Sequence, residues 1–326
     1  MDENGELRNS KGPLLEVRNL HMHYITDEET IKAVNGISFS IESGESLGLV
    51  GETGAGKTSA ALSIMQLVPD PPGIIVDGEI LFKGRNLVFN SERRSRQIRG
   101  NKISMVFQDP MTALNPIMPV GKQLTEVLMT HRKMSGGEAW ETVKKMIEIV
   151  GVKSDRLKDY PHQFSGGMKQ RVVVLMALLC NPELLIADEP TTALDVTIQA
   201  QVLEMIRQLR EKYKMSLLLI THDLGVVAET CDRVAIMYAG EIVEMGGTAD
   251  VFNLPMHPYT RGLFESIPRL DSPVDRLTPI DGQVPNPAGL PSGCFFHPRC
   301  RCRAPECDKV SPAYKAQGGH IYKCVL

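Results

Sequence analysis

The sequence predicts an α/β fold, in which parallel strands alternate with helices, over the first 245 residues. Three short runs, at 46–50, 184–187 and 217–220, are apolar without alternation. Such runs are typical of strands that are covered on both faces, as in a parallel sheet flanked by helices. Between the last two runs, apolar residues from Ile198 to Tyr213 recur at steps of four, four, three and four, which lines one face of a helix. Strand, helix and strand in this order predict a crossover unit of an α/β fold.

The composition is that of an ordinary globular chain of 326 residues, with 42% apolar and 23% charged residues. The formal net charge of −3 gives no overall basic field that would favour nucleic acid. The longest apolar run, Val172 to Cys180, has nine residues, whereas a membrane-spanning helix needs about 20. Residues 1–6 are acidic and polar, unlike a secretory signal. We therefore expect a soluble protein that reaches a membrane only through partners.

A change of composition near residue 250 predicts two domains, at 1–250 and 251–326. Eleven of the 21 prolines follow residue 250, and five of the seven cysteines fall in the last 33 residues. The other two cysteines, Cys180 and Cys231, lie in apolar segments, so we expect them to be buried core residues.

A phosphate-binding loop is predicted where the apolar run 46–50 ends. The following residues match G-x-x-x-x-G-K-[ST] and precede a predicted helix at 59–67. Glycines let several backbone N–H groups point at one phosphate, and the helix adds its positive end. Lys57 would neutralise the β- and γ-phosphates, and Thr58 would offer its hydroxyl to Mg²⁺. The predicted ATP-binding residues of this loop are Gly51, Glu52, Thr53, Gly54, Ala55, Gly56, Lys57, Thr58 and Ser59.

Two carboxylates follow the apolar run 184–187. A nucleotide site needs one carboxylate for the metal and another for the attacking water. We expect Asp188 to hold Mg²⁺, directly or through water, and Glu189 to orient and deprotonate the water.

A third motif stands between the phosphate loop and these carboxylates. Residues 164–171 read Phe-Ser-Gly-Gly-Met-Lys-Gln-Arg and precede an apolar, helix-like stretch. The segment resembles the signature of ATP-binding cassette (ABC) proteins, usually written LSGGQ, with Phe for Leu and Met for Gln. A second Ser-Gly-Gly, at 135–137, is not accompanied by the same neighbouring residues, so we expect a flexible turn there.

Four further elements stand in the order that the ABC family has. They are an aromatic residue where the family stacks one on adenine, its Q-loop glutamine, its D-loop and its switch histidine. In this sequence these elements are Tyr24, Gln108, Ala193-Leu194-Asp195 and His222. The chain is therefore similar to ABC-type P-loop NTPases.

The resemblance implies a RecA-like core with an antiparallel β subdomain, a helical subdomain at about 100–165 and a loop-rich C-terminal extension. In the family, two cassettes close head to tail on two ATP molecules. Ser165, Gly166, Gly167 and Met168 would contact the ATP of the partner subunit. His222 would contact the γ-phosphate beside Glu189, and Gln108 would join Thr58 and Asp188 around Mg²⁺.

Four segments resemble the oligopeptide and dipeptide importer branch of this family: 107–116, 191–197, 257–260 and 293–300. That branch implies two transmembrane permease subunits, a second ABC ATPase subunit (a different chain or another copy) and an extracytoplasmic solute-binding protein. The chain would then lie peripherally on the cytoplasmic face of the cell membrane and power peptide import. Nickel or a glycoside are alternative cargoes.

Three other functions fit the sequence less well. A nucleic-acid-stimulated ABC ATPase would use a basic cluster, but such short clusters are usually solvated faces, and no sustained heptad run accompanies this one. The cluster is Arg93, Arg94, Arg96, Arg99 and Lys102. A translation-associated ABC protein normally carries two cassettes, whereas each motif occurs once here. A non-enzymatic cassette would bind ATP without hydrolysing it, and the presence of Glu189, the expected base for hydrolysis, argues against that function. We expect no nucleic-acid partner.

The C-terminal cysteines predict a metal site. Cys294, Cys300, Cys307 and Cys324 are separated by 5, 6 and 16 residues, with Cys302 as a fifth. Disulfides rarely persist in a reducing cytosol. Zinc would accept four thiolates, but only Cys302 and Cys307 have the usual zinc spacing.

The alternatives for these cysteines stay open. Zinc could also take three thiolates with His297 or His320, and free thiols or disulfides need no metal. Some members of the resembling branch hold a 4Fe-4S cluster in this region, and four cysteines suit one. The favoured prediction is therefore a 4Fe-4S cluster on Cys294, Cys300, Cys307 and Cys324, with Zn²⁺ as the alternative and Cys302 as a spare.

Overall fold

The structure is a computed structural model that describes residues 12–88, 90–191, 195–266 and 279–326. The chain forms two compact units. The first unit comprises Met1–Ile41, Ser46–Val88 and Thr221–Leu326, and the second comprises Glu42–Glu45 and Phe89–Ile220. The first unit contains the predicted phosphate loop, and the second contains the two predicted carboxylates, Asp188 and Glu189.

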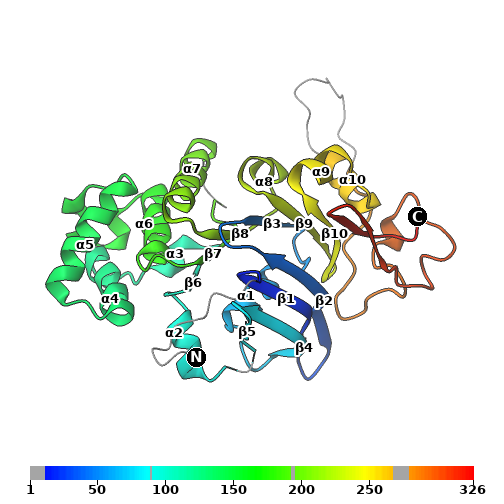
Figure 1. The fold of residues 1–326 in the computed structure, drawn as a ribbon, viewed down its shortest axis with the longest axis horizontal. Coiled ribbons are helices and arrows are strands. Elements are labelled where there is room, and N and C mark those ends of the chain that lie inside the picture. Colours follow the sequence, from blue (N-terminus) through cyan, green and yellow to red (C-terminus); the bar gives the residue numbers. More distant parts are fainter. Residues whose placement is uncertain (1–11, 89, 192–194, 267–278) are drawn as a thin grey trace. The chain divides into compact units, whose positions relative to one another are not determined.

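The first unit contains an antiparallel sheet in the order β2-β1-β4-β5 (Figure 1). Its strands are β1 (Leu15–Ile25), β2 (Thr30–Ile41), β4 (Gly73–Phe82) and β5 (Arg85–Asn86). Apolar side chains of β1 such as Leu15, Val17, Leu20 and Met22 are buried, and the residues between them are partly or fully exposed. This pattern is typical of an antiparallel sheet with one face on the core. The sheet is the antiparallel β subdomain that the resemblance implied.

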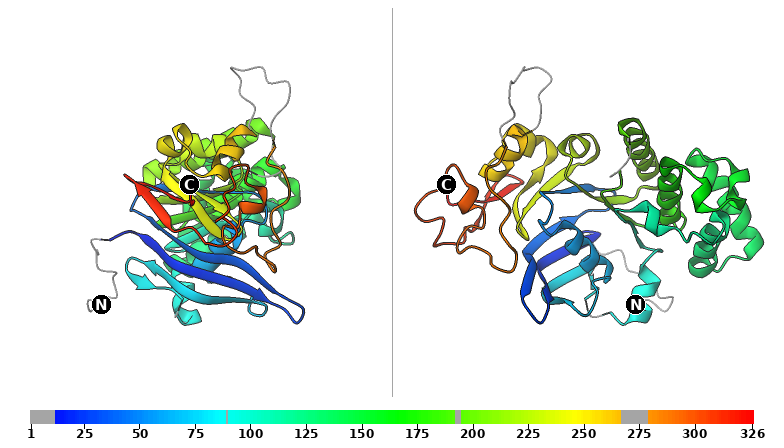
Figure 2. Two further views of the ribbon diagram at one scale, coloured as in Figure 1. Left: turned by 90° about the vertical axis from the view of Figure 1, so that its right-hand side faces the viewer. Right: turned by 180° about the vertical axis from the view of Figure 1, so that it is seen from behind.

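The first unit also contains a mixed sheet in the order β11-β12-β10-β9-β3. Strand β3 (Ser46–Val50) runs parallel to β9 (Arg233–Tyr238), which pairs antiparallel with β10 (Glu241–Gly247). The C-terminal hairpin of β11 (Tyr314–Gln317) and β12 (His320–Lys323) continues this sheet from β10, as Figure 2 shows in red beside yellow. The helices of this unit are α1 (Lys57–Met65), α8 (Leu224–Thr230), α9 (Thr248–Asn253) and α10 (Pro258–Glu265), and η3 (His297–Arg299) is a 3₁₀ turn.

The second unit contains three parallel strands, β6 (Ile103–Val106), β7 (Leu184–Asp188) and β8 (Ser216–Thr221), with β7 in the middle. Every residue of these strands is buried, which explains why their sequences are mainly apolar without alternation. The helices of this unit are α2 (Glu92–Ile98), α3 (Pro110–Ala113), α4 (Val120–Arg132), α5 (Gly136–Ile149), α6 (Gly166–Leu178) and α7 (Val196–Tyr213). Two 3₁₀ turns, η1 (Ser154–Lys158) and η2 (Pro161–Gln163), precede α6.

The α/β prediction is confirmed: strands form at all three apolar runs, and helix α7 joins two of them. Cys180 and Cys231 are buried, as expected. The flexible turn expected at 135–137 is wrong, because Ser135 begins helix α5. Its side chain accepts a hydrogen bond from the Glu138 backbone N–H while the Glu138 carboxylate accepts one from the Ser135 N–H. This capping box stabilises a helix start in spite of the two glycines that follow.

No helix within the described residues is long and apolar enough to cross a bilayer. The domain boundary near residue 250 and the helical subdomain at about 100–165 stay predictions.

Candidate nucleotide site

The phosphate loop lies in the first unit, between β3 and α1, where the sequence predicted it. Gly56 has a φ of 98°, in the left-handed region that favours glycine. A Cβ atom on Gly56 would also clash with the Ala33 carbonyl oxygen, and one on Gly51 with the Met237 carbonyl oxygen. Both glycines are therefore required by the tight path of the backbone. Thr53, Gly54 and Thr58 are exposed, so this side of the loop is open to a ligand.

Lys57 is buried at the start of α1, with an exposed fraction of 6%. Its Nζ donates hydrogen bonds to the carbonyl oxygens of Gly51 at 2.7 Å and Glu52 at 3.1 Å. The Glu52 carbonyl also accepts from the Ala55 N–H at 3.1 Å. An ammonium inside the loop is placed to donate charge-assisted hydrogen bonds to phosphate oxygens. The geometry therefore fits the predicted role of Lys57.

Tyr24 lies at the end of β1, half-buried, with its hydroxyl 3.5 Å from the Ser59 Oγ of α1. The ring is thus beside the first turn of the helix that follows the phosphate loop. This position agrees with an aromatic residue next to the base of a bound nucleotide.

The two carboxylates lie in the second unit, at the carboxyl end of the central parallel strand. Asp188 is the last residue of β7 and is 1% exposed. Glu189 has a φ of 44°, a left-handed conformation that costs energy for a residue with a side chain. Its backbone N–H donates to the Ile220 carbonyl oxygen at 2.8 Å, which holds this conformation from the neighbouring strand β8.

Gln108 lies two residues after β6 and contacts Glu189 directly. Its Nε2 donates a hydrogen bond to the Glu189 Oε2 at 2.9 Å. The sequence placed Gln108 at the metal and Glu189 at the water, but it did not predict that the two side chains would pair. Because the Gln108 amide donates to one carboxylate oxygen, it fixes the direction of the other.

The signature residues Ser165, Gly166, Gly167 and Met168 form the start of helix α6. Ser165 is the N-cap, and its Oγ accepts from the Met168 N–H at 3.4 Å. Ser165 and Gly166 are exposed, whereas a Cβ on Gly167 would lie 2.8 Å from the Ile198 Cγ2 atom. The exposed N-terminus of a 13-residue helix favours an anion, which agrees with the predicted clamp.

His222 and Asp195 are both exposed. His222 follows β8 directly and precedes Asp223, whose carboxylate caps helix α8. Asp195 occupies the N-cap position of α7, and Ala193 and Leu194 of the predicted D-loop lie outside the described residues. His222 belongs to the first unit and Glu189 to the second, so their meeting at one γ-phosphate stays a prediction.

The five C-terminal cysteines have free thiols. Cys307 and Cys324 are buried, Cys294 and Cys300 are half-buried, and Cys302 is exposed. Burial raises the pKa of the Cys294 thiol, and the nearby Cys307 and Cys324 thiols add to the rise. Burial likewise raises the pKa of Cys300 to about 11, with contributions from Cys302, Cys294 and Cys324. These contributions show that the four predicted ligands are neighbours.

The structure does not support the predicted metal site. In the part of the chain that the structure describes, no group of three or more His, Cys, Asp or Glu side chains is arranged to hold a metal ion. Neither the 4Fe-4S cluster nor the zinc alternative is preformed on these residues.

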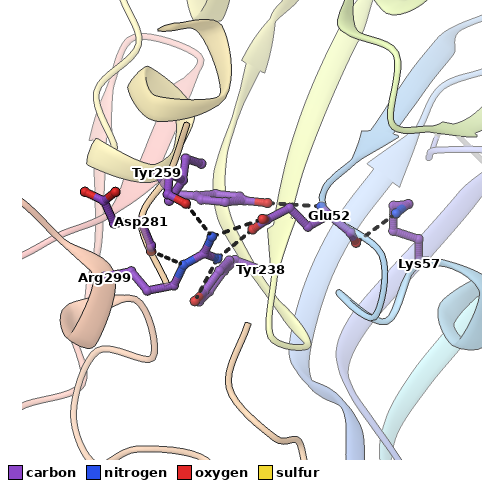
Figure 3. A network of polar contacts seen from close by, with 7 residues as sticks. Glu52, Lys57, Tyr238, Tyr259, Asp281 and Arg299 are labelled. Carbon is purple, nitrogen blue, oxygen red and sulfur yellow. Dashed lines mark hydrogen bonds and ion pairs between the residues drawn. The ribbon is translucent and has the colours of Figure 1, made fainter. Parts of the chain in front are cut away.

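Sequence reasoning missed Arg299, Tyr238 and Tyr259, whose side chains gather around Glu52 of the phosphate loop (Figure 3). No local pattern could indicate this contact, since Glu52 and Arg299 are 247 positions apart.

Comparisons with known proteins agree with the motifs. Residues 34–192 match the family model described as ABC transporter, and residues 243–307 match the one described as oligopeptide/dipeptide transporter, C-terminal region. The chain is 51% identical to the dipeptide transport ATP-binding protein DppD of Bacillus subtilis over 316 residues, covering 96% of this chain and 94% of that protein. It is 46% identical to the oligopeptide transport ATP-binding protein OppD of Salmonella typhimurium, covering 95% of this chain and 93% of that protein.

Among solved structures, a dimeric ATP-binding cassette in a post-hydrolysis state with ADP and phosphate is similar, with a TM-score of 0.65 and 25% identity. The match covers 72% of this chain and 98% of the cassette. The motifs, the fold and the similarity along nearly the whole chain agree, and the chain belongs to the family of ABC transporter ATP-binding proteins.

Proposed function

We propose that this chain is the ATP-hydrolysing subunit that powers import of dipeptides or oligopeptides through partner transmembrane permeases. The observation that carries the proposal is the 51% identity to a dipeptide transport ATP-binding protein over 96% of the chain. The match of residues 243–307 to the C-terminal region of oligopeptide and dipeptide transporters supports the cargo class.

In this proposal the phosphate loop binds ATP. Its backbone N–H groups and Lys57 hold the phosphates, and Tyr24 stacks on the adenine. Thr58, Asp188 and Gln108 would hold Mg²⁺, which neutralises charge on the phosphate oxygens when bound. The residues fit such an ion chemically, because a hydroxyl, a carboxylate and an amide oxygen are hard donors that suit Mg²⁺.

Glu189 acts as the general base in the proposed reaction. Its carboxylate accepts the proton of the attacking water, and His222 contacts the γ-phosphate and the same water. The bond between Gln108 and Glu189 supports this assignment, because it orients the carboxylate before substrate binds.

The active assembly is proposed to be a head-to-tail dimer with a second ABC ATPase. The exposed start of α6, at Ser165 and Gly166, would face the γ-phosphate bound to the other subunit, and Asp195 would lie near the same boundary. The dimeric cassette to which this chain is similar supports the arrangement. The dimer would dock on two permeases at the cytoplasmic face of the membrane, with an extracytoplasmic binding protein delivering the solute.

The cargo is tested by co-purifying the chain with its native permeases and partner ATPase, then measuring ATP hydrolysis with candidate solutes. Peptide delivered by the binding protein should stimulate hydrolysis, whereas nickel, a glycoside or nucleic acid should not. Stimulation by nickel or a glycoside alone would contradict the proposed peptide cargo but would leave the assignment as a transport ATPase intact. Stimulation by nucleic acid alone would contradict the proposal.

A 4Fe-4S cluster on Cys294, Cys300, Cys307 and Cys324 is a separate proposal. The observation in its favour is that the Cys294 N–H donates to the Cys307 carbonyl oxygen at 2.8 Å, so two of the four cysteines lie together. Anaerobic purification followed by iron, sulfide and zinc analysis decides it. Iron and sulfide with visible absorbance would support the cluster, stoichiometric zinc would assign the site to zinc, and a colourless protein without these elements would exclude both.

A further inference from the structure

An ion pair joins the C-terminal extension, residues 251–326, to the phosphate loop (Figure 3). The guanidinium of Arg299 donates two hydrogen bonds to the Glu52 carboxylate, from Nη1 to Oε2 at 2.7 Å and from Nη2 to Oε1 at 3.1 Å. This bidentate geometry fixes the orientation of both groups, and not only the distance between them. Glu52 is the residue directly after Gly51 in the loop, so the contact reaches the backbone that would surround the phosphates.

Arg299 is itself held on its other edge. Its Nε donates to the Asp281 carbonyl oxygen at 2.9 Å, and its Nη2 lies 3.4 Å from the Ile280 carbonyl oxygen. Its side chain is only 5% exposed, and its guanidinium carbon lies 5.8 Å from the centre of the Tyr238 ring. Arg299 is therefore a rigid part of the extension.

The backbone of Glu52 links the extension to Lys57. Its N–H donates to the Tyr259 hydroxyl oxygen of α10 at 3.0 Å, and its carbonyl oxygen accepts from the Lys57 Nζ at 3.1 Å. Tyr259 is fully buried, so its position is fixed by packing. One residue, Glu52, thus lies between two groups of the extension, Arg299 and Tyr259, and the lysine that would meet the phosphates.

The ion pair is not needed to attach the extension. Tyr238, Tyr259 and Phe296 form a buried aromatic cluster with ring centres 4.6 to 5.3 Å apart, and the β12 strand pairs with β10. Burying an arginine costs desolvation energy that its partner only offsets, so such a pair contributes little net stability. What the pair adds is a fixed position for Glu52.

We propose that Arg299 is a positioning residue for nucleotide binding, which acts through Glu52 to hold the first turn of the phosphate loop and the Lys57 ammonium in place. The inference rests on the proposed role of this loop. It gives the C-terminal extension a part in ATP binding that does not depend on which solute is transported.

The test compares Arg299→Ala, Glu52→Gln and the double variant by calorimetric titration of the full-length protein with Mg·ADP, which is not hydrolysed. We expect each single variant to weaken affinity about tenfold, because each removes the same charge-assisted contact. The double variant should bind no more weakly than either single variant, since Arg299 acts only through Glu52. General damage to the fold would instead give losses that multiply.

The controls separate this inference from the site assignment. Arg301→Ala is the matched control: Arg301 lies two positions away, and its ion pair with Asp281 is exposed, so its removal should leave affinity unchanged. Lys57→Ala should weaken binding by at least about tenfold if Lys57 contacts the phosphates. Arg299→Lys keeps the positive charge but loses the planar, bidentate donor, so it should give an intermediate loss of affinity. This variant keeps the test usable if Arg299→Ala does not fold.

Two results would overturn the inference. One is wild-type affinity in Arg299→Lys and Glu52→Gln while Lys57→Ala binds more weakly. The other is a double variant whose loss is the product of the single losses. Unaltered binding in Lys57→Ala would instead contradict the proposed nucleotide site itself.

Discussion

At the scale of the residue, Glu189 combines a strained backbone with an oriented side chain. Its φ of 44° is held by the bond to Ile220, and its carboxylate accepts from Gln108. Such strain at the end of a buried strand is typical of functional residues. In Glu189→Gln, the new amide oxygen can still accept from Gln108, so the local geometry should survive.

We therefore expect Glu189→Gln to bind ATP normally but to hydrolyse it at least about a hundredfold more slowly, because an amide does not accept the water's proton. Single-turnover hydrolysis by the purified transporter measures this rate, with ATP affinity measured in parallel. The variant should also accumulate an ATP-bound dimer. Near-normal hydrolysis would refute the role of Glu189.

Lys57 is expected to act on binding and not only on turnover. In Lys57→Ala, the positive charge that faces the phosphates is lost, so nucleotide affinity should fall by at least about tenfold. Calorimetry with ATP on the wild type and the variant gives the comparison. Equal affinities would mean that Lys57 does not contact the phosphates.

The residue roles could be predicted from spacing, because phosphate loops and acidic strand ends need fixed residue types at fixed positions. The pairing of Gln108 with Glu189 could not, since the two residues are 81 positions apart and meet only because β6 and β7 are neighbouring parallel strands. The contact of Arg299 with Glu52 could not be predicted either, because these residues are 247 positions apart in the sequence.

At the scale of the element, Gln108 connects strand β6 to the helices that follow it. Glu189 fixes its amide on one side, and α3 and α4 continue the chain on the other. A change at the γ-phosphate that moves Glu189 would therefore move the start of the segment 110–160, which we propose contacts the permeases.

We expect Gln108→Ala to impair peptide transport more than basal ATP hydrolysis, because the variant separates the site from this segment. Both rates are measured in proteoliposomes that contain the native permeases. A transport-to-hydrolysis ratio equal to that of the wild type would exclude the coupling role.

Elements with unmistakable patterns were predictable. The strands at 46–50, 184–187 and 217–220 are uniformly apolar because both faces are covered, and α7 has a regular apolar stripe. Helix α5 shows why the Ser-Gly-Gly at 135–137 misled: glycines suggest a turn, but the reciprocal bonds of Ser135 and Glu138 begin a helix there. The glutamate three positions after the serine was the signal in the sequence.

At the scale of the molecule, each unit is organised around its own strands, and residues Thr221–Leu326 belong to the first unit. Strand β12 pairs with β10 through Glu244 with Tyr322 and Met245 with Ile321. Composition indicated a change near residue 250 but not this pairing, because antiparallel strands far apart in sequence leave no local signal. The cysteine spacing, likewise, indicated a metal site that the described residues do not form.

We propose that ATP hydrolysis by this chain drives peptide uptake. It is tested most directly by measuring accumulation of a labelled peptide in proteoliposomes that contain the chain, its partner ATPase, the native permeases and the binding protein. We expect accumulation that requires ATP and that is lost when Glu189→Gln replaces the wild-type chain. Accumulation without ATP, or equal accumulation with Glu189→Gln, would contradict it.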